Sequence, residues 1–159
     1  MQKIRIFFTN LILLLVLFIS TGCSSNGDVI EQHFELTQSN KILIKDFYRE
    51  VFDEKEIDKA DKYIATNYIQ HNPWAGDGLE AFKQFFAFYF KENPNFSMSI
   101  KRIIAEGDLV AVHVLGQQDN NDVGSAVIDI YRVQDGKIVE HWDVLQKVTE
   151  SVKNANGML

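Results

Sequence analysis

The chain has 159 residues, of which 46% are hydrophobic, and it carries a formal net charge of -6. This length predicts one folded domain, and twelve phenylalanines supply apolar volume for its core. The net negative charge argues against nucleic acid as a partner, because a phosphate backbone attracts cationic surfaces. The single cysteine excludes an internal disulfide, so the fold depends on its hydrophobic core.

The N-terminus resembles a bacterial lipoprotein signal. Lys3 and Arg5 precede an apolar run over 11–19, and Cys23 follows shortly after it. The run is shorter than the roughly 20 residues that span a bilayer. We expect a signal peptide over residues 1–22, lipidation of Cys23, and an extracytoplasmic protein anchored to the bacterial cell membrane. An uncleaved anchor and an ordinary signal peptide are the alternatives, and each of the three would export the domain.

Helical periodicity dominates the first half of the mature chain. After a polar tether over 23–34, apolar residues recur at helical spacing from 36 to 52. A second, short helix is expected from 58 to 65. Pro73 restricts the residue before it, so 68–74 is expected to be a loop. A third helix, rich in phenylalanine and tyrosine, is expected over 79–91.

The second half predicts strands. Alternating and β-branched residues indicate strands over 97–106, 109–118, 123–133 and 137–148, and residues 150–159 form a tail. Three N-terminal helices followed by an antiparallel meander make an α+β domain over 35–149.

The turn of the final hairpin decides which side chains share a face of the sheet. A two-residue turn would place Asp129 and Asp143 on opposite faces. A three-residue loop, with Gly136 left-handed in a bulge, would instead place Asp129 opposite His141 and on the same face as Asp143. We favour the three-residue loop, because residues 134–135 suit a type I turn. A slip of one residue would reverse this assignment.

In the favoured register, an otherwise apolar and aromatic face carries two carboxylates and an imidazole. A face meant only for packing would not keep them, because each unpaired buried polar group costs roughly a few kcal/mol. We therefore expect a pocket in which Asp143 acts as a general acid/base. His141 and Asp129 are expected to orient or polarise a substrate oxygen.

Five further residues are candidates for this pocket. His71 precedes an Asn-Pro turn that could direct it to the mouth of the sheet, although it could also cap a helix. Tyr48 and Tyr131 could donate to a substrate carbonyl, or they could simply pack. His113 lies within an apolar strand and is more often a core histidine than a ligand-binding one. Trp74 is expected at the rim or in a lid.

Two segments, YIQHNP over 68–73 and DGKIVEHWD over 135–143, together with the helices-first order, resemble the SnoaL-like polyketide cyclases. These belong to the nuclear transport factor 2-like superfamily, and the two motifs together are typical of its aldol-condensation-catalysing branch. The resemblance implies a bent sheet wrapped around a cone-shaped pocket that the helices close. It also implies homodimers through the outer sheet face and a proton-shuttling acid at Asp143. Asp129 stands where relatives often have a histidine.

The expected function is that of a cofactor-free acid/base enzyme, of cyclase, isomerase or lyase type, acting on a small carbonyl compound. A non-catalytic lipoprotein that binds a small apolar ligand, or an interaction module using the outer sheet face, are the alternatives. We expect neither an organic cofactor nor a metal, because closely spaced histidine pairs are absent from the sequence.

Overall fold

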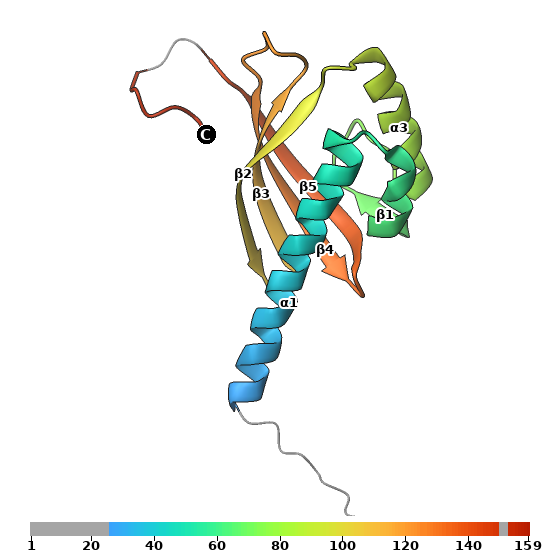
Figure 1. Ribbon diagram of the computed structural model, residues 1–159, viewed down its shortest axis with the longest axis vertical. Coiled ribbons are helices and arrows are strands. Elements are labelled where there is room, and N and C mark those ends of the chain that lie inside the picture. Colours follow the sequence, from blue (N-terminus) through green and yellow to red (C-terminus); the bar gives the residue numbers. More distant parts are fainter. Residues whose placement is uncertain (1–25, 150–152) are drawn as a thin grey trace, which may run out of the picture.

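The computed structural model describes residues 26–149 and 153–159 (Figure 1). The predicted signal peptide, with its lipidation site Cys23, lies outside these described residues. Within them, every helix is too short or too polar to cross a membrane. Residues 153–159 contain bends but neither helix nor strand.

The first helix is longer than the sequence indicated. α1 (Asn26–Phe47) continues directly into a π-helix, η1 (Tyr48–Asp53). The prediction of a polar tether over 23–34 is therefore wrong from residue 26 onward, because those residues are helical. This part of α1 protrudes beyond the sheet (Figure 1), and its side chains are exposed. Burial begins at Thr37, which explains why the apolar pattern marked only the later turns.

The second helix is shorter than expected, and a strand takes over its end. A 3-10 turn, η2 (Ile57–Lys59), leads into α2 (Ala60–Tyr63), and β1 (Ile64–Gln70) follows at once. The expected loop therefore starts only after β1. This strand pairs in parallel with the last strand of the chain, over 137–147, which is far away in the sequence. Its backbone hydrogen bonds thus come from a contact that local periodicity cannot indicate.

The four predicted strands are confirmed, and β1 adds a fifth. They are β2 (Ser97–Glu106), β3 (Leu109–Gln117), β4 (Ser125–Gln134) and β5 (Lys137–Lys147). The order across the sheet is β1-β5-β4-β3-β2, with β1 parallel and the other pairs antiparallel. α3 (Leu79–Glu92) packs beside β1. The α+β class, with helices packed on a curved sheet, is confirmed.

The favoured register of the final hairpin is wrong. The turn has two residues, Asp135 and Gly136, both with positive φ, as a type I′ turn requires. A bulge then shifts the register between Arg132 and Val133. The turn and the bulge together move β5 by one residue relative to a regular two-residue hairpin.

This shift keeps the predicted face but changes the predicted pairs. Asp129 lies opposite Asp143 rather than opposite His141, and His141 lies opposite Tyr131. All four side chains nevertheless point to the inner side of the sheet, where they line one cavity. The expected grouping therefore holds although the turn that was meant to produce it does not.

The core lies between the helices and this inner face. Ile44, Phe47 and Val51 are almost completely buried, and so are Val110 and Val112 of β3. The buried face of the helical segment packs on β2 and β3, so the helices cover one side of the sheet (Figure 1). Burying side chains of this size contributes roughly 1.5–3 kcal/mol each relative to exposure.

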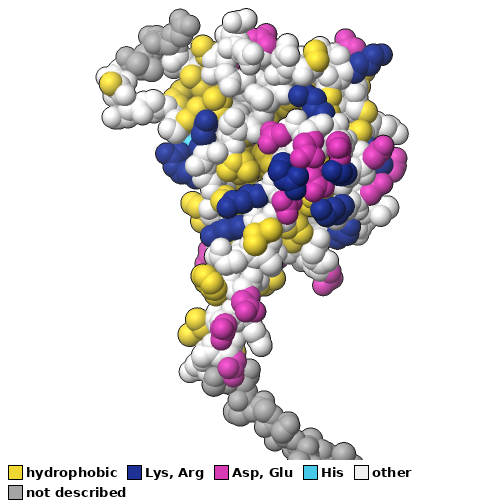
Figure 2. Space-filling model, viewed as in Figure 1, with side chains coloured by type: hydrophobic (Ala, Val, Ile, Leu, Met, Phe, Trp, Pro, Cys, Tyr) yellow, Lys and Arg dark blue, Asp and Glu magenta, His cyan; other side chains and the backbone are white. Residues whose placement is uncertain are grey.

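Ion pairs cover the surface over η1, η2 and α2. Glu50, which is nearly buried, accepts hydrogen bonds from Arg49 and Lys62 at 3.0 and 3.3 Å. Lys83 of α3 is 3.0 Å from Asp61. Figure 2 shows acidic and basic side chains gathered on this side of the molecule. The network joins the short helices to α3 and leaves the opposite, inner side of α3 apolar.

Candidate active site

A cavity of about 440 Å³ lies between the inner face of the sheet and α3. Its volume is within the range of small-molecule sites, roughly 300–1,000 Å³. One wall is aromatic and comes from the helices and the segment after α3: Phe47, Phe52, Phe82, Phe86, Tyr89 and Phe96. The opposite wall carries polar groups from β1, β4 and β5. A ligand here would have an apolar body and a polar end.

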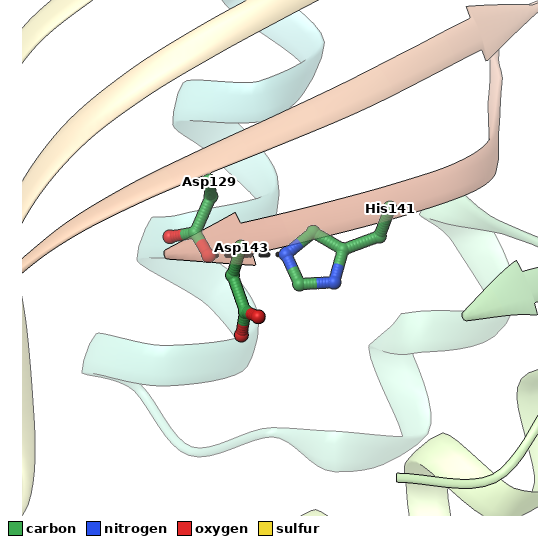
Figure 3. A group of neighbouring side chains, drawn as sticks. All are labelled: Asp129, His141 and Asp143. Atoms are coloured by element: carbon green, nitrogen blue, oxygen red, sulfur yellow. Dashed lines mark hydrogen bonds and ion pairs between the residues drawn. The ribbon is translucent and has the colours of Figure 1, made fainter. Parts of the chain in front are cut away.

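Three side chains form the centre of the polar wall (Figure 3). Asp129 projects from β4, and His141 and Asp143 project from β5. One nitrogen or oxygen of each lies within 4.8 Å of the other two. Asp129 and His141 are buried, whereas Asp143 is half-buried and faces the cavity. The structure therefore brings together the three residues that the alternation of β4 and β5 had indicated.

The tautomer of His141 follows from its contact with Gln70. Gln70 Oε1 accepts the backbone N–H of Asn72 at 2.9 Å, and its Nε2 donates to the Tyr68 hydroxyl at 2.9 Å, which fixes the orientation of the amide. The same Oε1 lies 3.0 Å from His141 Nδ1. A carbonyl oxygen can only accept, so Nδ1 carries a hydrogen. Only Nε2 of His141 is then free to gain or lose a proton.

That nitrogen faces the buried carboxyl of Asp129. His141 Nε2 lies 3.0 Å from Asp129 Oδ1, and Tyr48 donates to Asp129 Oδ2 at 2.5 Å. Because Tyr48 uses its hydrogen on Asp129, Tyr131 must be the donor in the 3.2 Å contact between the two hydroxyls. A single proton therefore lies between His141 and Asp129, and either residue can hold it.

The two tyrosines stay neutral under this arrangement. Burial raises the pKa of Tyr48 and of Tyr131 well above the ordinary value, and the charge of Asp129 raises the pKa of both further. The π-helix positions Tyr48, because its wider turn places this residue on the inner side, where its ring also contacts Tyr131. Both residues were candidates for substrate contact. The hydroxyl of Tyr48 instead holds Asp129, and that of Tyr131 bonds to Tyr48, while the side chain of Tyr131 does line the cavity.

Asp143 is held by a neighbour that the sequence analysis did not single out. Asn72 Nδ2 donates to Asp143 Oδ2 at 2.7 Å. The side-chain oxygen of Asn72 accepts the backbone N–H of Trp74 at 3.0 Å, so the amide is oriented from both ends. Trp74 lines the cavity with 84% of its surface exposed, which agrees with the predicted rim position. Among the described residues, the second oxygen of Asp143 makes no hydrogen bond, so it can face a ligand.

Tyr68 is a second residue that the sequence analysis missed. Its ring lines the cavity and is buried, and its hydroxyl accepts the hydrogen bond from Gln70. The hydroxyl hydrogen of Tyr68 is therefore available to an acceptor in the cavity. Burial raises the pKa of Tyr68, and the charges of Asp129 and Asp143 raise it further, so the group acts as a donor.

Spacing could have indicated these residues. Tyr68, Gln70 and Asn72 alternate along the chain, the period of side chains on one face of a strand. Assigning 68–74 to a loop removed the reason to look for that period. Once β1 is placed beside β5, Gln70 meets His141, Asn72 meets Asp143, and Tyr68 lines the same cavity.

His71 is not in the cavity, and its expected pocket role is therefore wrong. Its ring stacks on Trp142 at the outer face of the sheet, with centroids 4.8 Å apart and planes at 5°. Its Nε2 lies 2.8 Å from Glu140, whose pKa is lowered by the guanidinium of Arg132 and by His71. As neighbours of His141 and Asp143 along β5, Glu140 and Trp142 alternate to the other face.

His113 also lies away from the cavity. Its Nδ1 accepts a 2.8 Å hydrogen bond from Arg102 on the neighbouring strand β2. The apolar residues on either side, Val112 and Val114, are the ones that point into the core. The expected core position of His113 and its candidate ligand-binding role are therefore both wrong, because strand alternation turns it to the outer face.

Donor chemistry alone would allow the central cluster to hold a divalent cation, since it combines one imidazole with two carboxylates. The contact between His141 Nε2 and Asp129 Oδ1 joins the atoms that a metal would need. The same groups can also exchange protons, and the hydrogen-bond distance between them suits that use.

The family model of the SnoaL-like polyketide cyclases matches residues 42–151, more than half of the chain. The chain belongs to this family. The match contains every residue of the cavity that takes part in the hydrogen bonds described above. A search of curated proteins finds no match.

Solved structures share the fold of this chain. A candidate polyketide cyclase from Acidithiobacillus ferrooxidans is 22% identical, with a TM-score of 0.58, over 67% of this chain and 87% of its own. IdmH, a candidate polyketide cyclase from Streptomyces antibioticus, is 24% identical, with a TM-score of 0.57, over 67% and 91%. AclR, a candidate hydroxylase from Streptomyces galilaeus, is 20% identical, with a TM-score of 0.57, over 70% and 81%. At these identities the likeness concerns the fold.

Proposed function

We propose that this protein is a cofactor-free acid/base enzyme, of cyclase, isomerase or lyase type, acting on a small carbonyl compound. The observation that carries the proposal is the position of Asp143. Its carboxyl is half-buried in an apolar cavity, is oriented by Asn72, and lies beside the buried His141 and Asp129. A base for carbon acids needs such an oriented carboxylate in a site from which most water is excluded.

In the proposed reaction, Asp143 takes a proton from the carbon next to the carbonyl group. The negative charge moves to the carbonyl oxygen, and the hydroxyl of Tyr68 donates a hydrogen bond to the resulting enolate. The enolate carbon then attacks a second carbonyl carbon in a cyclase, which leaves an alkoxide to be protonated, or takes a proton back in an isomerase. In either case Asp143 returns the proton and regains its charge. The aromatic wall holds the apolar body of the substrate in place.

His141 and Asp129 supply a second proton position. Gln70 keeps the Nδ1 hydrogen of His141 in place, so any proton exchange with a substrate takes place at Nε2. When the Asp129 carboxyl is ionised, the hydroxyl of Tyr48 stabilises its negative charge by donating to the other oxygen. The pair can therefore protonate a product alkoxide or enolate oxygen and recover the proton later. Two proton positions of different kinds suit addition and elimination as well as isomerisation.

The family supports this class of reaction but leaves the substrate open. The solved relatives include candidate cyclases and a candidate hydroxylase on one fold, so the reaction has to be assigned from the site. The experiment therefore needs a readout that does not depend on knowing the natural substrate. Exchange of the protons next to a carbonyl group for deuterium reports the first proposed step directly.

Acetylnaphthalene, an uncharged aromatic ketone, is a suitable probe, and proton NMR in D₂O follows the loss of its methyl signal. The wild-type protein should accelerate this exchange. Asp143→Asn preserves the shape of the side chain and can still accept from Asn72, yet it should reduce the rate by a factor of about 10²–10⁴. Glu31→Gln, on the exposed part of α1, removes a carboxylate far from the cavity and should leave the rate unchanged.

An exchange rate that is the same in wild type and Asp143→Asn would contradict the proposal. Tight binding of acetylnaphthalene with no acceleration in the wild type would instead favour a non-catalytic ligand-binding protein. Both outcomes are separated from misfolding by comparing the near-UV circular dichroism of the two proteins.

A further inference from the structure

The side chains that line the cavity include more acidic groups than basic groups. They comprise three carboxylates, one imidazole and one ammonium group: Asp122, Asp129, Asp143, His141 and Lys147. The ammonium group is thus the one permanent positive charge among the described residues of the lining. Which carboxylates lack a cationic partner decides what charge a ligand can carry.

The ammonium group is already engaged at the rim. Lys147 Nζ lies 2.6 Å from Asp122 Oδ1. That contact is the largest cause of the lowered pKa of Asp122, and the backbone N–H groups of Gln118 and Gly124 lower it further. Asp122 is therefore ionised near neutral pH, and it neutralises Lys147. The rim pair adds no net charge to the cavity.

The His141–Asp129 pair is neutral as a unit, because one proton is shared between the two residues. Asp143 is different. Its hydrogen-bond partner among the described side chains is the amide of Asn72, which carries no charge. Ionised Asp143 thus leaves one uncompensated negative charge, facing an apolar cavity in which water screens it poorly.

We propose that the cavity selects uncharged carbonyl compounds, ketones or esters, and excludes compounds that bring a carboxylate or phosphate into it. This inference rests on the proposed function, because it takes Asp143 as the ionised base. With an uncharged substrate, proton transfer only moves the negative charge from Asp143 to the enolate oxygen. With an anionic substrate, two negative charges would share the cavity both before and after the transfer.

The size of the discrimination follows from Coulomb's law. Two unit charges roughly 7 Å apart at an effective dielectric constant of about 20 repel strongly enough to lower affinity by more than tenfold. The aromatic wall carries no cation that could compensate the charge of an anion. An uncharged carbonyl oxygen, by contrast, can accept from the hydroxyl of Tyr68 without meeting this repulsion.

The test compares two probes that have the same ring system and differ in charge. Acetylnaphthalene is uncharged, and naphthoate is an anion at pH 7. Isothermal titration with the full-length protein should give at least tenfold tighter binding for the ketone. Naphthylmethylammonium, the matching cation, should bind no more weakly than the ketone.

The variant Asp143→Asn should remove most of the discrimination. Naphthoate affinity should rise about tenfold, whereas the affinity for acetylnaphthalene should change less than threefold. Glu31→Gln makes the same change in net charge on the protruding part of α1 (Figure 1) and should leave both affinities unchanged. This control separates a local effect from one of the overall acidic charge.

Equal affinity for ketone and carboxylate in the wild type would overturn the inference. So would a failure of the ketone to bind, or the same ratio of affinities in Asp143→Asn as in wild type. The proposed function fails separately: selective binding of the ketone without proton exchange would leave charge selection standing and refute the catalytic role of Asp143.

Discussion

His71 and Asn72 are adjacent in the chain, yet their side chains reach opposite faces of the sheet. Asn72 donates to Asp143 in the cavity, whereas His71 stacks on Trp142 outside it. The backbone N–H of His71 also donates to the carbonyl oxygen of His141 at 3.0 Å. The end of β1 is thus fixed to β5 from both sides. The orientation of Asp143 therefore depends in part on contacts outside the cavity.

Replacing Gln70 by leucine should alter the tautomer of His141. The variant removes the oxygen that accepts from His141 Nδ1 and from the backbone of Asn72. In long-range ¹⁵N–¹H NMR spectra, wild-type Nδ1 should be protonated, and Gln70→Leu should shift the population toward protonation at Nε2. Two partly buried donors lose their acceptor, so the free energy of unfolding should fall by about 1–3 kcal/mol.

Gln84→Leu is the matched control for this variant, because Gln84 is exposed on α3. It should change neither the nitrogen shifts of His141 nor the stability appreciably. If Gln70→Leu left the His141 shifts as in wild type, the assignment of the Nδ1 hydrogen to this contact would be wrong.

Buried tyrosines should make the protein sensitive to alkali. The pKa values of Tyr48, Tyr68 and Tyr131 are raised in the folded state, so above pH 10 the unfolded state loses protons that the folded state keeps. The free energy of unfolding should therefore fall as the pH rises above about 10, by about 1.4 kcal/mol per pH unit for each group. Urea unfolding between pH 8 and 11 measures this slope.

Tyr131→Phe isolates the contribution of one hydroxyl. This variant should be less stable than wild type at pH 8, because the hydrogen bond to Tyr48 is lost. Its stability should then decline less steeply above pH 10, by about 1.4 kcal/mol per pH unit. Parallel curves for the two proteins would show that Tyr131 ionises normally in the folded state.

Part of the site could be predicted because it depends on local alternation alone. His141 and Asp143 are two residues apart on one strand, so they share a face whatever the hairpin turn does. The position of Asp129 depended on the turn and on the bulge beside Val133, which together shift the register. A prediction that had only one of the two features right would have placed Asp129 outside the cavity.

The remaining part of the site depends on long-range pairing. Gln70 and Tyr68 reach the site only because β1 lies parallel to β5 and is stabilised there by a strand more than sixty residues away along the chain. No local property of 64–70 fixes that partner. The first half of α1 was missed for a different reason: its side chains are exposed, so no buried stripe marks it.

The β3–β4 loop contains a position that should accept only glycine. Gly124 has a φ of +86°, and an added Cβ would lie 2.6 Å from the carbonyl oxygen of Gly116. Gly124→Ala should therefore lower the free energy of unfolding by about 2–5 kcal/mol, through backbone strain and overlap together. Gly136→Ala is the control, because φ is +70° there but no atom lies within 4 Å. It should lose only about 1–2 kcal/mol, and equal losses would mean that the contact at Gly124 can relax.

The ion pair of Asp122 with Lys147 should make the free energy of unfolding fall at low pH. Lys147, with the backbone N–H groups of Gln118 and Gly124, lowers the pKa of Asp122 to about 2 in the folded state. Its contribution should thus be complete above about pH 4, the range of an unfolded aspartate, and should disappear as the pH falls toward 2. At pH 6, Asp122→Asn should unfold at lower urea concentration than wild type, and this difference should shrink steadily between pH 4 and 2. A difference that stayed constant over that interval would mean that Asp122 acts through the shape of the loop rather than through its charge.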